Sequence, residues 1–132
     1  MTSADQFMVA LCLWREARGV GNSGMVAVAC VLRNRVARNK SSYYAEVVKP
    51  WQFSSITAKN DPQLGLYPSS ADSSYQLAQK IVASISQDTL ADTTEGSTLY
   101  YDDSIPFPAG WDIHKVEDTV KIGRLNFFKE LV

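Results

Sequence analysis

The spacing of hydrophobic residues changes along this chain, and that change limits the folds it can adopt. Up to about residue 87 they recur every three or four positions, as Phe7, Leu11 and Trp14 do, which is typical of amphipathic helices. After about residue 98 they alternate around short turns, which is typical of strands. Helices followed by a smaller β element predict an α+β fold, mainly helical, with the β element near the C-terminus.

The first helix is predicted over residues 4–18. Ser3 and Gln6 have the spacing of a capping box, in which each side chain bonds to the other residue's backbone. Gly19 and Gly21 would end the helix, because glycine enters the left-handed cap conformation without steric cost.

Further helices are predicted over residues 22–39, 43–48 and 72–87. Asn22 or Ser23 can cap the first of these. Pro50 ends the second, because the residue before proline avoids the helical region. Residues 51–70 predict a long irregular loop, and loops of this length in compact domains are usually functional or disordered.

The end of the chain predicts a strand over residues 98–101 and then a hairpin. Residues 120–122 and 125–127 alternate around a two-residue turn that Gly123 can open. A helix over residues 117–131 is the competing interpretation, because the same hydrophobic residues also fit one face of a helical wheel.

Length and charge restrict the class of protein. A chain of 132 residues is one domain, so residues 1–132 are predicted as a single domain, which we expect to be a monomer. A net charge of −1 gives no basic surface for nucleic acid. No apolar run is long enough for a membrane span, and Phe7–Trp14 lacks the basic flank of a signal peptide.

Cys12 and Cys30 are predicted as buried thiols, although a disulfide is left open.

Residues Gly19–Gly24 match the pattern G-x-G-x-x-G, which is found in dinucleotide-binding proteins. That mechanism needs a strand directly before the first glycine. Residues 14–18 are charged and suit a helix instead. Dinucleotide binding is therefore kept only as the lesser alternative.

The chain is poor in metal ligands and in classical catalytic bases. It contains a single histidine, His114, and no cysteine pair with zinc-ligand spacing. Neither a metal nor a cofactor is predicted, and Ser-His-Asp chemistry has no support.

Glu16 is the best-placed acid in the sequence. It lies in the last predicted turn of the first helix, where the helix dipole disfavours an ionised carboxylate and raises its pKa. Burial would act in the same direction, whereas Arg15 and Arg18 fall on other faces of the helix. A glutamate that is protonated near neutral pH can act as a general acid on a glycosidic oxygen.

The residues around Glu16 belong to a longer pattern. The segments that carry it are Glu16-Ala17-Arg18-Gly19, Gly24 to Ala29, Asn34-Arg35-Val36, Trp51-Gln52-Phe53-Ser54, Thr98-Leu99-Tyr100-Tyr101, and Ile122-Gly123 with Phe127-Phe128. In this order the sequence resembles the bacterial cell-wall hydrolase family that includes the spore-cortex-lytic enzymes. It departs from the family at Val20, where a second glutamate is expected, and between Gly123 and Phe127, where a histidine is absent.

The resemblance implies a lysozyme-like domain that cleaves peptidoglycan glycan strands at the β-1,4 bond between N-acetylmuramic acid and N-acetylglucosamine. It implies that Glu16 is the general acid and base, as in lytic transglycosylases, without a cofactor. A lysozyme-type reaction would use a second acid, for which Asp102 and Asp103 are candidates. The residues expected to contact the glycan are Gln52, Phe53, Ser54, Tyr100 and Tyr101. Phe53 is equally well interpreted as a core residue, and strand alternation allows only one of the two tyrosines to line the groove.

The resemblance also bears on how the protein would reach the cell wall, on the alternative function and on two supporting residues. The protein would reach the wall as a phage endolysin does, remaining cytoplasmic until its release, or as a domain of a secreted enzyme. The other function considered is a catalytically inactive peptidoglycan-binding module on the same fold. Asn34 either supports Glu16 from the second helix or is a helix-surface amide, and Trp111 either covers the groove or holds its own loop in place.

Overall fold

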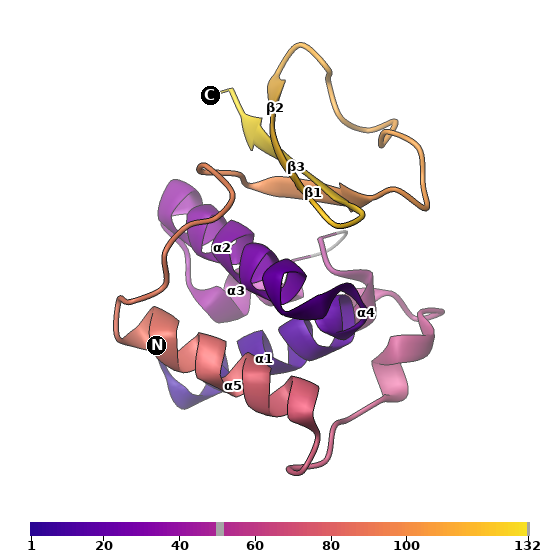
Figure 1. Ribbon diagram of the computed structural model, residues 1–132. Helices are drawn as coiled ribbons and strands as arrows, with labels where there is room; N and C mark the ends of the chain where they lie inside the picture. The colour runs from indigo at the N-terminus through magenta and orange to yellow at the C-terminus, as the bar shows by residue number, and fades with distance from the viewer. Residues whose placement is uncertain (50–51, 132) are drawn as a thin grey trace.

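A computed structural model of the chain describes residues 1–49 and 52–131. Helices come first in the chain and a small sheet follows, which confirms the predicted α+β class (Figure 1). The helices are α1 (Ser3–Ala17), α2 (Gly21–Asn39), α3 (Tyr43–Val48), α4 (Ser54–Thr57) and α5 (Ser73–Ser86), with 3-10 turns η1 (Arg18–Val20) and η2 (Pro62–Gly65). The strands are β1 (Leu99–Asp102), β2 (Val116–Ile122) and β3 (Leu125–Glu130).

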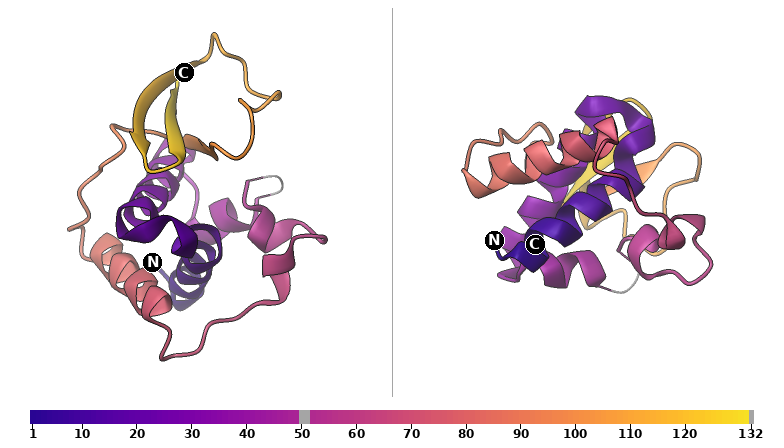
Figure 2. Two further views of the ribbon diagram at one scale, coloured as in Figure 1. Left: turned by 45° about the vertical axis from the view of Figure 1, so that its right-hand side comes forward. Right: turned by 90° about the horizontal axis from the view of Figure 1, so that it is seen from below.

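Helices α1 and α2 form the centre of the core. Val9 and Leu13 of α1 and Ala27 and Val31 of α2 have no exposed surface. In Figure 1 and in the left view of Figure 2, α2 lies between the sheet and helix α5. Both central helices therefore bury residues on more than one side, unlike a surface helix with a single apolar stripe.

The ends of the first two helices differ from the prediction. The capping box of α1 uses Thr2 and Asp5, so the prediction of Ser3 and Gln6 was wrong by one residue. Helix α1 continues directly into η1, and α2 begins at Gly21 with no side-chain cap. Because Val20 before it is not extended, no residue there has the backbone that a capping side chain needs, so capping by Asn22 or Ser23 was also wrong.

Gly24 has a packing role. A Cβ atom at this position would lie 2.5 Å from Cγ2 of Val20, which is too close for any side chain. The glycine thus lets η1 fold back against the start of α2. A helix, α1, precedes Gly19–Gly24, so the strand that a dinucleotide site requires is absent and that alternative is overturned.

The sheet has the order β1-β3-β2, with both pairs antiparallel. Strands β2 and β3 form the predicted hairpin, with Gly123 at a positive φ of 58° in the turn, so the competing helix over residues 117–131 was wrong. Leu125 and Phe127 are buried in the core, whereas the ring of Phe128 packs against Tyr101. One face of the sheet thus covers the helices.

The segment predicted as an irregular loop is partly helical, because it contains α4 and η2. Pro50 and Trp51 lie outside the described residues. Cys12 and Cys30 are buried free thiols, as predicted. Among the described residues, no helix has the length and apolar character needed to cross a membrane.

Candidate active site

Glu16 is the penultimate residue of α1, and its side chain is partly buried. Burial raises its pKa to about 7, and the charge of Asp61 acts in the same direction. Ser55 and Arg35 oppose the rise, because a nearby donor and a guanidinium both favour the carboxylate. The direction agrees with the sequence prediction, and near neutral pH both protonation states of Glu16 are populated.

Asp61 is a residue that the sequence analysis missed. It is the cap of η2, and its carboxylate accepts hydrogen bonds from Ser54 Oγ at 2.7 Å and from the backbone N–H of Gln63 at 2.8 Å. These bonds fix it in place close enough to act on Glu16. The only signal in the sequence was its position in the long segment over residues 51–70.

The predicted second acids are engaged elsewhere. Asp102 accepts a hydrogen bond from Arg124 Nε at 2.6 Å, and Asp103 lies 2.7 Å from Lys121 Nζ and also accepts a bond from Asn126. The acid whose charge raises the pKa of Glu16 is Asp61.

Arg15 connects α1 to the segment that carries Ser55 and Asp61. Its guanidinium donates to the backbone carbonyl oxygens of Ser55 at 3.0 Å, Leu64 at 3.1 Å and Leu66 at 2.9 Å. Although adjacent to Glu16 in sequence, it turns away from it, as predicted. Arg15 therefore holds the segment that covers Glu16.

Arg18 also turns away from Glu16, because its guanidinium lies 4.0 Å from the centre of the Trp14 ring.

Asn34 donates to Asp92 and to the carbonyl of Ser97. The hypothesis that Asn34 supports Glu16 was therefore wrong, because its amide nitrogen donates both of these bonds to the loop before β1.

Arg35, the next residue of α2, takes the place expected for Asn34. Its side chain is buried, its Nε donates to the carbonyl of Thr98 at 2.6 Å, and its guanidinium lies 5.2 Å from the centre of the Phe53 ring. From there its charge acts on Glu16. The sequence contained Arg35 in the Asn34-Arg35-Val36 segment but did not single it out.

The predicted glycan contacts divide into exposed and buried residues. Gln52 and Ser54 are exposed and can meet a ligand. Phe53 has no exposed surface, so its prediction as a contact residue was wrong: it is a core residue on which Arg35 packs.

Tyr100 and Tyr101 point to opposite faces of β1, as strand alternation predicts. The ring of Tyr100 packs on Phe127, and burial together with the charge of Glu16 raises the pKa of its hydroxyl. Tyr101 packs on Phe107, Trp111 and Phe128. Of the two, Tyr100 is therefore the one near Glu16.

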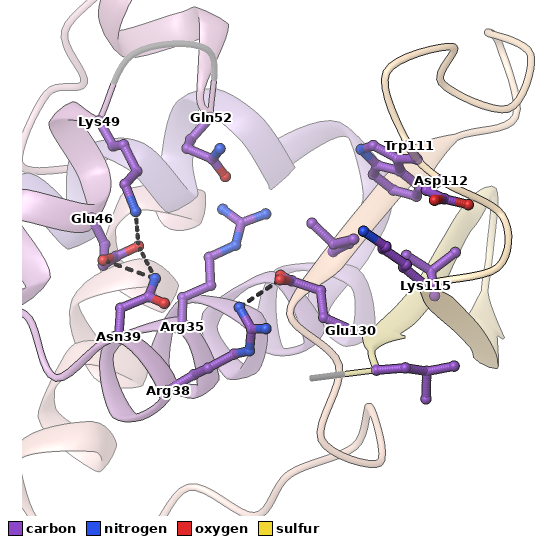
Figure 3. Close-up of a pocket in the computed structure, with 13 residues that line it drawn as sticks. Arg35, Arg38, Asn39, Glu46, Lys49, Gln52, Trp111, Asp112, Lys115 and Glu130 are labelled. Carbon is purple, nitrogen blue, oxygen red and sulfur yellow. Dashed lines mark hydrogen bonds and ion pairs between the residues drawn. The ribbon is translucent and has the colours of Figure 1, made fainter.

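A hollow of about 440 Å³ lies beside Arg35, between the ends of α2 and α3 and the loop before β2 (Figure 3). It is lined by charged and apolar residues, including Arg35, Arg38, Glu46, Gln52, Trp111 and Lys115. Since Arg35 lines the hollow and its charge acts on Glu16, the hollow lies near that acid, although Glu16 is not one of its lining residues. The part of the chain that the structure describes has no cluster of three His, Cys, Asp or Glu residues that could hold a metal ion.

Comparison with solved structures finds close agreement over nearly the whole chain. The catalytic domain of the germination-specific lytic transglycosylase SleB from Bacillus anthracis matches with 25% identity and a TM-score of 0.73, covering 98% of this chain and 97% of that one. The catalytic domain of the Bacillus cereus SleB protein matches with 25% identity and a TM-score of 0.69, covering 97% and 91%. No curated protein matches the chain.

The fold is thus that of the SleB catalytic domains, as the resemblance to lysozyme-like enzymes predicted. A family model described as Cell Wall Hydrolase matches residues 19–128. The matched range begins three residues after Glu16 and contains Arg35, Ser55, Asp61 and Tyr100, which surround that acid. With most of its length matched, the chain belongs to the cell wall hydrolase family.

Proposed function

We propose that the protein cleaves the glycan strands of peptidoglycan at the β-1,4 bond between N-acetylmuramic acid and N-acetylglucosamine, with Glu16 as the general acid and base. The observation that carries the proposal is the pKa of Glu16, which burial and Asp61 raise to about 7. Such a group can both donate and accept a proton at neutral pH. Membership of the family and similarity to a lytic transglycosylase support the same substrate class.

In the first step, protonated Glu16 gives its proton to the glycosidic oxygen as the bond from that oxygen to C1 of the muramic acid breaks. The leaving chain departs as an alcohol, and C1 becomes electron-poor. Glu16 is now a carboxylate, which the charge of Arg35 stabilises. The charge of Asp61 has the opposite effect and favours the return of a proton to Glu16 in the second step.

In the second step, the Glu16 carboxylate takes the proton of the 6-hydroxyl group of the same sugar while the hydroxyl oxygen bonds to C1. The product is a 1,6-anhydro sugar, and Glu16 is protonated again. This route needs a single proton-transfer group and suits a site in which Asp102 and Asp103 are paired with cations. We therefore favour the lytic transglycosylase reaction over hydrolysis.

The Glu16→Gln variant tests the proposed role. It removes the proton-transfer group while keeping the size of the side chain, and we expect the release of fragments from purified cell walls to fall about a thousandfold. The matched control is Glu117→Gln, an exposed position on β2, which should keep full activity. A Glu16→Gln variant that still lyses walls would overturn the proposal.

Two further measurements separate the alternatives. Mass spectrometry distinguishes the reactions, because 1,6-anhydro ends are one water lighter than the reducing ends that hydrolysis leaves. A wild-type protein that binds walls without releasing fragments would instead support the inactive binding module. Action as a monomeric single domain, and arrival at the wall as an endolysin or within a secreted enzyme, remain predictions from the sequence.

A further inference from the structure

The acids in the hollow beside Arg35 are largely neutralised by their neighbours. Glu46 is buried and lies 3.7 Å from Lys49 Nζ. Glu130 lies 2.5 Å from Arg38 Nη1. These pairs leave two cations, Arg35 and Lys115, facing a single remaining acid, Asp112. The hollow therefore carries an excess of positive charge.

Arg35 is the stronger indication of a ligand. Its side chain is 7% exposed, and its Nη1 is buried without a hydrogen-bond partner in the described part of the chain. A charged donor that is buried and unpaired is unfavourable, and an anionic acceptor placed beside it removes that cost. Because Arg35 lines the hollow, a carboxylate bound there would supply such an acceptor.

Lys115 faces the same space from the opposite wall (Figure 3). Its side chain is exposed and forms no ion pair with the residues that the structure describes. Asp112 lies near Lys115, and one of its carboxylate oxygens, Oδ1, already accepts a hydrogen bond from the backbone N–H of His114 at 2.9 Å. Lys115 thus adds a second positive charge to the hollow, on the wall opposite Arg35.

The remaining walls suit a sugar ring. Trp111 lines the hollow, and its ring is held by packing against Tyr101 and Phe128 at 5.8 and 5.5 Å. A flat apolar ring face packs well on an aromatic side chain, and a fixed polar group then selects its hydroxyls. The exposed amide of Gln52 lies across from Trp111 and can provide that group (Figure 3).

We propose that this hollow binds a carboxylate-bearing sugar unit of the glycan strand, with the sugar ring on Trp111 and the carboxylate between Arg35 and Lys115. The inference rests on the proposed function and adds a substrate requirement to it. In peptidoglycan the carboxylate has two possible sources, the lactyl group of muramic acid or the stem peptide attached to it. The chemistry of recognition is the same for both.

The experiment measures binding by calorimetry with Glu16→Gln protein, so that no strand is cleaved. Three probes are compared: peptide-bearing strands, peptide-stripped strands with free lactyl carboxylates, and stripped strands whose carboxylates are converted to methyl amides. Lys115→Gln is the test substitution and Lys115→Arg the rescue. Lys129→Gln is the control, because Lys129 is an exposed lysine of β3 at which the same charge change falls outside the hollow.

We expect Lys115→Gln to weaken binding of a carboxylate-bearing probe about fivefold, with no change for the methyl amide probe, and Lys115→Arg to restore it. An effect on stripped strands alone identifies the lactyl carboxylate, and an effect on peptide-bearing strands identifies the stem peptide. Equal binding by Lys115→Gln and Lys129→Gln, or an equal loss on all three probes, overturns the inference. Failure of the wild type to release fragments from walls would instead overturn the proposed function, which this binding comparison does not test.

Discussion

Two pairs of acids in this protein have opposite surroundings. Asp102 and Asp103, at the end of β1, are each bonded to a cation of the β2–β3 hairpin, Arg124 and Lys121. In the helical part, Glu16 is partly buried near the negative charge of Asp61, and it forms no ion pair among the described residues. The first pair is arranged for charge balance, whereas the second keeps a proton available.

The largest expected effect concerns the stability cost of the unpaired acid. The pKa of Glu16 is about 7 in the folded protein and 4.5 in the reference state. The unfolded chain therefore ionises first, and the folded protein loses stability as pH rises from about 4.5 through 7. Glu16→Gln removes this cost and should be more stable than the wild type at pH 8 by up to about 3 kcal/mol.

Denaturant unfolding at pH 8 and pH 4 measures this difference. At pH 4 the two proteins should have nearly equal free energies of unfolding, because Glu16 is protonated in both states of the wild type. A Glu16→Gln variant that is less stable than the wild type at pH 8 would contradict the assigned surroundings of Glu16.

A smaller effect is expected from Asp61→Asn, which removes the neighbouring negative charge. The pKa of Glu16 should fall, so that less of it is protonated at neutral pH and the alkaline limit of activity moves to lower pH. The measurement is the pH profile of fragment release. Asn keeps the size of the side chain: its Oδ1 can accept the bond from the Gln63 N–H, and its Nδ2 can donate to Ser54 Oγ in place of the bond that Asp61 accepts. An unchanged profile would show that the charge of Asp61 does not control Glu16.

The smallest effect is expected in the sheet. Asp102→Asn breaks a largely exposed ion pair with Arg124, and such pairs contribute at most about 1 kcal/mol to stability. Thermal unfolding should change little, and the pH profile of activity should match the wild type. A shifted profile in Asp102→Asn would mean that the sheet acid acts on the reaction after all, and that the two pairs do not differ in role.

Local patterns were enough to predict most of the fold. Helical spacing located α1, α2, α3 and α5, and the alternation around Gly123 located the hairpin, because both depend on neighbouring residues. Cap residues were missed where one 3-10 turn, η1, connects two helices without an extended residue between them. In this geometry Gly24 packs directly against Val20 of η1, a contact that the search for capping residues did not consider.

The candidate site was predicted less completely. Glu16 was chosen from its position at a helix end together with the family resemblance. The direction of its pKa agrees with that prediction, but burial and the charge of Asp61 produce the rise. Asp61 and Arg35 reach it from distant segments, so their contribution depends on the tertiary structure. Phe53 was mistaken for a ligand contact because an aromatic residue in a loop can face either the solvent or the core.

The bonds from Arg15 to the carbonyls of Ser55, Leu64 and Leu66 hold residues 55–66 against the helical turn that carries Glu16. Arg15 and Glu16 are consecutive residues of one helical turn, so the proposed acid and the guanidinium that holds residues 55–66 belong to the same helix. Displacing residues 55–66 from this turn would let water reach Glu16 and would lower the pKa of its carboxyl group. A compound that binds between this helical turn and residues 55–66 would therefore reduce the protonated fraction of Glu16 at neutral pH without contacting Glu16 itself.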